Sequence, residues 1–270
     1  SRNEKAASGD LSFSDVRVAE GTYYPDEGPG VTGGTTTASF QPILNGTLLG
    51  GYPAGGGTRD PSANVTVLSG DVDQDDATNS DGVTLAASDV VGSNSTSVVA
   101  WTNGTFGNTF TVDGFTITGG QANGGSGEAA RGGGVYFDTF SDNLKLRNLR
   151  FRGNVAAQGG GGLYAYNDGR VHLSDAYVRG NEAATGGGMF IPRHGSVVKR
   201  ATFVQNQADR GGAVAFGAGI DSISVPNVLV NARVVNNTAT QTGGGVYVTG
   251  SDDQKTGNDQ YDDDFRGACE

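Results

Sequence analysis

The chain has very little cysteine, methionine or tryptophan, with one residue of each among 270. The single cysteine, Cys269, is next to last, so no disulfide can form within the chain. A small disulfide-stapled scaffold is therefore excluded, although long repeat folds outside the cell often lack disulfides too. No apolar run is long enough for a membrane-spanning helix, so we expect no membrane span. The chain begins Ser1-Arg2-Asn3 without methionine or a signal peptide, and we expect a processed or trimmed product.

Basic residues are also scarce, with 18 Lys and Arg against 29 Asp and Glu and a net charge of −11. An acidic protein repels nucleic acid and anionic membrane surfaces, so we expect neither as a partner. The balance suits a salty or calcium-containing medium. It is equally typical of a solvated acidic surface that keeps a protein in solution.

Glycine, in contrast, is abundant, with 47 residues and no strict triplet period, which excludes collagen. It is concentrated in blocks that recur along the chain, each followed by an apolar segment. These blocks begin at Gly132, Gly160, Gly186, Gly211 and Gly243. Between them lies a second repeated element, an apolar residue three positions before an asparagine: Phe151-Arg-Gly-Asn154, Val178-Arg-Gly-Asn181, Phe203-Val-Gln-Asn206 and Val234-Val-Asn-Asn237.

Within each repeat the apolar residues alternate, as in Leu144-Lys145-Leu146-Arg147, and alternation predicts short strands with one buried face. A coil of three such strands and three turns, stacked on the next coil at about 4.8 Å, satisfies the pattern. The sequence therefore predicts an all-β fold, a single-stranded right-handed parallel β-helix (solenoid) with short strands, glycine turns and an asparagine ladder.

Equivalent side chains of successive coils are expected to stack. One apolar ladder is predicted from Phe151, Val178, Phe203 and Val234, and another from Val135, Leu163, Met189 and Val214. An asparagine ladder is predicted at a corner with left-handed backbone, from Asn154, Asn181, Asn206 and Asn237. The glycine pairs are expected to supply positive φ at the opposite corner.

The two repeated elements resemble the GGA(I/V/L) and FxxN repeats of chlamydial polymorphic outer membrane proteins. They also resemble bacterial and archaeal surface proteins with right-handed β-helix repeats, and segments such as Val16–Pro25 and Val112–Gly120 extend the likeness upstream. Val178 and Val234 replace the FxxN phenylalanine but remain apolar. The resemblance implies extracellular or cell-surface display and often adhesion, and it carries no shared catalytic residues.

The chain divides into three parts that differ in how regular their repeats are. We expect irregular N-terminal coils with loop insertions over 1–112, regular coils over 113–249, and an acidic tail or linker over 250–270. Neither end of the solenoid carries a convincing capping helix. The chain is therefore trimmed, or irregular segments cap it, or a second copy stacks head to tail, which would build a filament.

The most chemically suggestive stretch is acidic. Asp71, Asp73, Asp75 and Asp76 lie in one six-residue segment with the alternate spacing of a calcium loop, and Asp81 follows. Asp76 stands where such loops have glycine, and Gly82 stands where they have glutamate. We expect calcium to be bound by these five aspartates, and the alternative is an ordinary solvated loop.

Five N-x-S/T sequons also occur, at Asn45, Asn64, Asn94, Asn103 and Asn236. Glycans on them would place the protein outside the cell, whereas a chain rich in Asn, Ser and Thr produces several by chance.

Five arginines are predicted to project outward from adjacent coils: Arg147, Arg150, Arg152, Arg179 and Arg233. Polysaccharide lyases on this fold use calcium with basic side chains to neutralise a uronate and abstract its proton. The alternative is that outward strand positions simply provide solubility. No acidic cluster matches these arginines in register.

No other chemistry stands out. His172 and His194 are isolated, no HExxH or GxSxG motif occurs, and no catalytic residue is assigned. The sequence predicts an extracellular structural or adhesive β-helix protein that assembles end to end or binds glycans. The alternative is a calcium-assisted lyase, or a hydrolase, acting on acidic polysaccharide.

Overall fold

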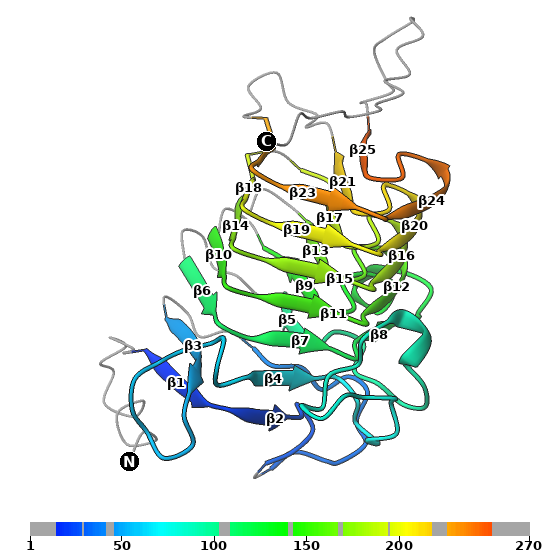
Figure 1. The fold of residues 1–270 in the computed structure, drawn as a ribbon. Helices are drawn as coiled ribbons and strands as arrows, with labels where there is room; N and C mark the ends of the chain where they lie inside the picture. The colour runs from blue at the N-terminus through cyan, green and yellow to red at the C-terminus, as the bar shows by residue number, and fades with distance from the viewer. Residues whose placement is uncertain are drawn as a thin grey trace, which may run out of the picture.

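The structure is a computed structural model that describes residues 15–28, 30–41, 46–102, 109–139, 143–166, 170–193, 195–217 and 226–249. Within these ranges short strands form four sheets, and the strands of each sheet pair in parallel. Figure 1 shows the chain climbing through these sheets, from β1 and β2 at one end to β23, β24 and β25 at the other. The predicted all-β fold, a parallel β-helix, is confirmed.

The first and second sheets have seven strands each. The first contains β1 (Val16–Ala19), β3 (Thr47–Tyr52), β6 (Thr109–Asp113), β10 (Asn143–Arg147), β14 (Arg170–Ser174), β18 (Val197–Lys199) and β22 (Val228–Val230). The second contains β2 (Gly21–Tyr23), β4 (Thr66–Ser69), β7 (Thr116–Thr118), β11 (Arg150–Arg152), β15 (Tyr177–Arg179), β19 (Thr202–Val204) and β23 (Arg233–Val235).

The third and fourth sheets lie beyond the asparagine corner. The third contains β8 (Gln121–Ala122), β12 (Val155–Gly159), β16 (Glu182–Thr185), β20 (Gln207–Arg210) and β24 (Thr238–Thr242). The fourth contains β5 (Val99–Trp101), β9 (Val135–Asp138), β13 (Leu163–Tyr166), β17 (Met189–Ile191), β21 (Val214–Gly217) and β25 (Val246–Thr249). Two short 3-10 helices, η1 (Ala87–Asp89) and η2 (Gly127–Ala130), lie in the connections.

Each regular coil has four strands, as in β10 to β13, so the prediction of three strands per coil is wrong. The strand missed is that of the third sheet. Its inward positions are alanines: Ala122, Ala156, Ala183 and Ala208 are 0–4% exposed and follow one another in register. Alanine gives little hydrophobic contrast, so this strand and the glycine block after it resemble a turn in the sequence.

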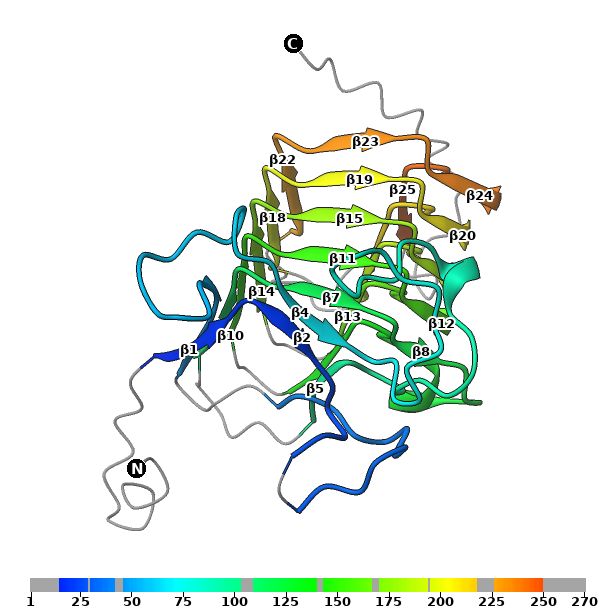
Figure 2. The ribbon, with the colours of Figure 1, turned by 60° about the horizontal axis from the view of Figure 1, so that its bottom comes forward.

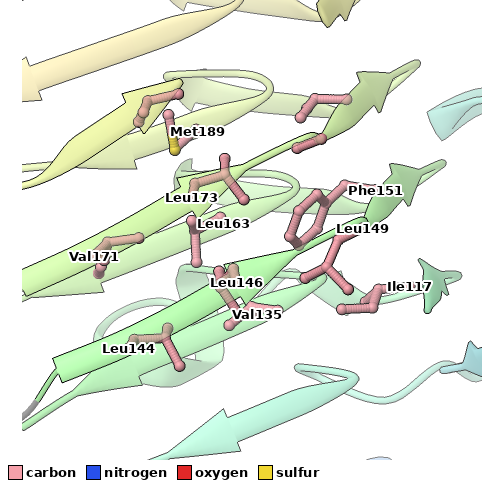
Figure 3. Close-up of a cluster of buried hydrophobic side chains, with 14 of the residues drawn as sticks. Ile117, Val135, Leu144, Leu146, Leu149, Phe151, Leu163, Val171, Leu173 and Met189 are labelled. Atoms are coloured by element: carbon pink, nitrogen blue, oxygen red, sulfur yellow. The ribbon is translucent and has the colours of Figure 1, made fainter. Parts of the chain in front are cut away.

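The interior is filled by ladders of equivalent side chains. Phe151 pairs with Val178, Val178 with Phe203 and Phe203 with Val234 along the second sheet. The ladder of the fourth sheet runs through Val135, Leu163, Met189 and Val214. Figure 3 shows Val135, Leu163 and Met189 of the fourth sheet and Phe151 of the second among the buried side chains, together with Leu144, Leu146 and Leu173 of the first sheet. Both predicted apolar ladders are present.

The asparagine ladder is a chain of side-chain hydrogen bonds. Nδ2 of Asn154 donates to Oδ1 of Asn181 (2.9 Å), the next pair repeats the bond at 2.9 Å, and Asn206 donates to Asn237 at 2.8 Å. The expectation of left-handed backbone at these asparagines is wrong. The residue before each takes positive φ instead: Gly153, Gly180, Gln205 and Asn236. The asparagine itself is then free to point inward and satisfy buried backbone groups.

The glycine blocks turn the chain between the third and fourth sheets. The first glycine of each block is left-handed, with φ of 62–65° at Gly132, Gly160, Gly186, Gly211 and Gly243. The next glycine has no room for a side chain, since a Cβ on Gly187 would lie 2.1 Å from the carbonyl oxygen of Gln207. The predicted positive φ at the glycine corner is confirmed.

The N-terminal coils carry long excursions after β2, β3 and β4, whereas the strands from β9 to β21 follow one another closely. The excursions after β3 and β4 position the features described next. The predicted acidic tail, 250–270, lies outside the described residues.

Candidate functional site

The acidic segment 71–76 leaves the second sheet after β4 and folds into a tight loop. The carboxylate of Asp71 builds this turn, because Oδ1 accepts the backbone N–H of Asp75 and Oδ2 that of Asp76, both at 3.1 Å. Gln74 takes a positive φ of 58° between them. Such side-chain to backbone bonds are the usual way aspartate stabilises a local turn.

Asp76 fastens the loop to a distant segment. Its Oδ1 accepts the backbone N–H of Val91 (2.7 Å), and its Oδ2 accepts the Thr84 hydroxyl and the Asn94 amide, both at 3.0 Å. Asp76 is 9% and Asp71 3% exposed. Two carboxylates are therefore held in fixed positions and away from bulk water.

Three carboxylates converge. Asp71, Asp75 and Asp76 each offer an oxygen, and these oxygens lie within 4.8 Å of one another. Burial raises the pKa of all three carboxyls and brings that of Asp76 to about 6. Repulsion adds to this, from Asp73 at Asp75 and from Asp71 at Asp76. In the described part of the chain no Lys or Arg forms an ion pair with them. The group therefore lacks a positive charge nearby.

Of the five aspartates predicted to bind calcium, Asp73 and Asp81 are not members of this group. Asp73 Oδ2 accepts the backbone N–H of Ser93 at 2.8 Å. Asp81 is exposed, and its backbone N–H donates to Oδ1 of Asn79 at 3.0 Å. Sequence reasoning missed Thr84 and Asn94, which reach the loop from farther along the chain and carry no spacing signal.

The donors fit a hard cation. All are oxygens, which suit Ca²⁺ and lack the nitrogen and sulfur ligands of zinc sites. Asn94 faces this group through its amide Nδ2, which donates to Asp76, while its buried Oδ1 finds no hydrogen-bond partner among the described residues. Asp71, Asp75 and Asp76, with Asn94 beside them, are the residues that would hold a cation.

The sequons lie in different environments. Asn94 is 3% exposed, and its Nδ2 donates to both Asp76 and the Gly119 carbonyl, so a glycan there would break two buried bonds. Asn64 is half-buried and Asn236 is exposed. Asn45 and Asn103 lie outside the described residues.

Four of the five predicted arginines lie on the outer face of the second sheet. Arg150 and Arg152 flank inward Phe151 on β11, Arg179 follows Val178 on β15, and Arg233 precedes Val234 on β23. Arg147 lies instead at the end of β10 in the first sheet. Figure 2 shows the strands of the second sheet from β7 to β23 stacked one above another.

A cleft of about 350 Å³ opens at one margin of this face, between the loop after β3 and the corner before β11 and β15. Charged and aromatic side chains line it: Arg59, Asp60, Arg150, Asp175 and Tyr177. Arg59 is paired with Asp113 (2.5 Å), and Arg200 with Asp175 (2.7 Å).

Among the described residues His172 belongs to no group that could hold a metal ion. His172 is exposed on β14, and its pKa is lowered by partial burial and by Lys145, Arg170 and Lys199. His194 lies outside the described residues. Within the described ranges no helix is long and apolar enough to cross a membrane.

Comparisons with protein-family models, curated proteins and solved structures find no significant match.

Proposed function

We propose that this chain is an extracellular or cell-surface structural and adhesive protein whose outer flanks form a rigid binding surface. The observation that carries this is the filled interior. The interior gap lined by Val99, Trp101 and Phe137 holds only about 10 Å³, whereas the cleft beside Arg59 and Arg150 on the outside holds about 350 Å³, which supports ligand binding on the outer surface. The repeats, which resemble those of chlamydial polymorphic outer membrane proteins, support surface display.

End-to-end association of two copies is part of this proposal. Three large apolar side chains of the last described coil are well exposed, Val228 at 40%, Val230 at 41% and Val248 at 55%. Strands at the end of a stack offer unpaired backbone groups to another chain. Head-to-tail contact of this kind is heterologous and grows into filaments.

Sedimentation velocity over a wide concentration range tests the assembly. We expect species larger than the monomer to increase with concentration, and Val248→Lys to suppress them, because Val248 is the register partner of core Phe216 and a charge there would be buried at the contact. Leu85→Lys, an exposed apolar position on the flanking loop, is the matched control. A strictly monomeric protein at every concentration would remove end-to-end assembly.

We further propose that Ca²⁺ binds at Asp71, Asp75 and Asp76 and stabilises the loop that borders the second sheet. A ligand that binds only the folded state raises the thermal midpoint. Calorimetric titration should show heat on addition of Ca²⁺, and Asp75→Asn should weaken it at least about tenfold. Asp89→Asn, in η1, is the control. Absence of both heat and thermal stabilisation would exclude the site.

The second candidate is a lyase acting on acidic polysaccharide, and the charged cleft with Arg59, Arg150 and Asp175 favours it. Such a reaction would need a cation to neutralise the uronate carboxylate and a separate unprotonated base to remove the C5 proton, and the C4–O glycosidic bond would break to leave the unsaturated product. Incubation with polygalacturonate or alginate, followed by absorbance of the unsaturated product, distinguishes the two functions. Product formation would establish the enzyme.

A further inference from the structure

The outer face of the second sheet places like charges side by side. Arg152 on β11 and Arg179 on β15 are register partners in adjacent strands, and Arg150 is two residues from Arg152 on the same face. The inward neighbours Phe151 and Val178 are each 1% exposed, so all three arginines point outward. Like charges directly opposite each other destabilise a sheet.

No ion pair neutralises these arginines within the part of the chain that the structure describes. Among the described residues the ion pairs are those of Arg59 and Arg200, and no carboxylate pairs with Arg150, Arg152 or Arg179. Arg152 instead lies over the ring of Tyr177, 5.1 Å from its centroid. Partial burial, together with Arg179 and Arg150, lowers its pKa. On a protein of net charge −11 such a group of arginines is a local positive site that attracts anions.

Two loops border this face. On one side Nη1 of Arg150 reaches the carbonyl of Pro61 at 3.5 Å, beside the charged cleft. On the other, the segment 84–87 packs on the turns after β11 and β15, where the N–H of Ala87 donates to the carbonyl of Gly180 at 2.8 Å. The Thr118 hydroxyl also donates to Thr84 at 2.9 Å. The arginines therefore lie on the floor of a bordered strip.

We propose that this strip, with Arg150, Arg152, Arg179 and Tyr177 at its centre, binds an anionic polysaccharide that carries carboxylate or sulfate groups. The inference rests on the proposed adhesive function for the class of ligand, and on the geometry of the second sheet for its location.

Three features support a polysaccharide chain. Guanidinium groups bind carboxylate and sulfate with two parallel hydrogen bonds. The arginines of the strip lie on adjacent coils, which are about 4.8 Å apart. Half-buried Tyr177, the register partner of Arg150, adds an aromatic ring of the kind that packs against sugars. The dense charge of a DNA duplex is repelled by the acidic body.

Affinity electrophoresis and calorimetry with polygalacturonate, a sulfated galactan and neutral dextran test the proposal on the intact chain. The test variant is Arg152→Gln with Arg179→Gln. The matched control is Arg147→Gln with Arg170→Gln, two exposed arginines of the first sheet whose loss changes the net charge equally. Circular dichroism checks that each variant is folded, and Arg179→Gln alone serves if the double variant is not.

We expect at least one anionic polymer to bind, and we expect its affinity to fall as salt is added. The test variant should bind that polymer about tenfold or more weakly than the wild type. The control should stay within about twofold. Whether the carboxylated or the sulfated polymer binds identifies the anionic group. Equal loss in both variants, equal binding of dextran, or tighter binding of a DNA duplex would overturn the proposal. If the protein binds an anionic polymer but does not self-associate, the polysaccharide-binding proposal stands and the proposal of end-to-end assembly falls.

Discussion

Left-handed residues at the corners of the coils show what single positions contribute. Between the first and second sheets the corner is occupied by Asn148, Asp175, Arg200 and Asn231, all with φ near 50–57°. Side chains are accepted there because the corner faces solvent. At the corner before the fourth sheet every left-handed residue of the regular coils is glycine. A Cβ on Gly186 would lie 2.2 Å from the carbonyl oxygen of Met189. Both the steric clash and the positive φ therefore disfavour any residue other than glycine at this position.

We expect Gly186→Ala to lower the free energy of unfolding by about 1–3 kcal/mol or more, since it adds backbone strain and a clash with backbone. Gly125→Ala is the control, because a Cβ there meets nothing within 4 Å and its φ is not left-handed. The control should change stability by at most about 0.5 kcal/mol. Equal effects in denaturant melts would contradict the assigned corner geometry.

Buried Tyr164 is expected to make the stability of the fold depend on pH in the alkaline range. It is 2% exposed, stacks on Tyr136 at 5.6 Å between ring centroids, and has its pKa raised by burial to about 12. Between pH 10 and 12 the unfolded chain loses this proton and the folded chain keeps it. Stability is therefore full below the unfolded pKa and falls as pH rises toward 12, by about 2–3 kcal/mol.

Tyr164→Phe should remove this part of the alkaline loss. Thermal midpoints of wild type and variant should differ in slope between pH 10 and 12 and run parallel between pH 6 and 8. Tyr52→Phe, at a less buried tyrosine, is the control. Parallel profiles across the whole range would show that the Tyr164 phenol ionises freely in the folded protein.

Strands of only three to five residues are stabilised by what lies above and below them. Asn181 illustrates this, because its Oδ1 accepts both the backbone N–H (3.1 Å) and the side-chain Nδ2 (2.9 Å) of Asn154, and its Nδ2 donates to the Phe151 carbonyl at 3.0 Å. Each bond joins neighbouring coils, so the ladder holds one coil to the next at a buried corner.

Asn181→Ala would leave two or more of these buried groups unsatisfied, at about 1–3 kcal/mol for each. We expect a fall in the unfolding midpoint that Asn123→Ala, at an exposed asparagine, does not cause. Hydrogen exchange should accelerate first at the amide of Asn154. Unchanged exchange at that amide would contradict the ladder.

The elements that sequence could predict are those with strong side-chain contrast. Phe151 indicated the second sheet because it alternates with arginines, and Leu163 and Met189 indicated the fourth because each follows a recurring glycine block. The third sheet was missed because its core residues are alanines such as Ala156. The sequence predicted that Asp71, Asp75 and Asp76 lie together, because they are close in the chain. It did not predict Asn94 beside them, because Asn94 reaches Asp76 only through folding.

The pairing of Arg152 with Arg179 follows from the predicted ladder of Phe151 and Val178, because each arginine is the next residue in its strand. The two loops beside the arginines could not be predicted, since they depend on how the irregular N-terminal coils fold along the flank. Chain segments far apart in sequence meet there, and no local pattern encodes the contact.

Taken as a whole, the molecule is a stack whose interior is solid and whose outer faces repeat at the coil spacing. The side-chain ladders hold each coil to the next along the axis. The loops inserted in the N-terminal coils make the outer surface differ from one coil to another. Both the proposed calcium loop and the arginine strip lie where such loops meet the second sheet. Their chemistry therefore depends on one premise, that equivalent residues of successive coils are in parallel register.

Disulfide trapping tests that premise. In a Cys269→Ser background, Lys145→Cys with His172→Cys places thiols on outward register partners of β10 and β14. Adjacent parallel strands lie about 4.8 Å apart, within the range of Cα separations that a disulfide spans. Lys145→Cys with Arg170→Cys is the control, since Arg170 pairs with Asn143 and lies two residues out of register. Mass spectrometry after mild oxidation should find the first pair linked and the second free. Efficient linkage of the second pair, or of neither, would contradict the stacked register.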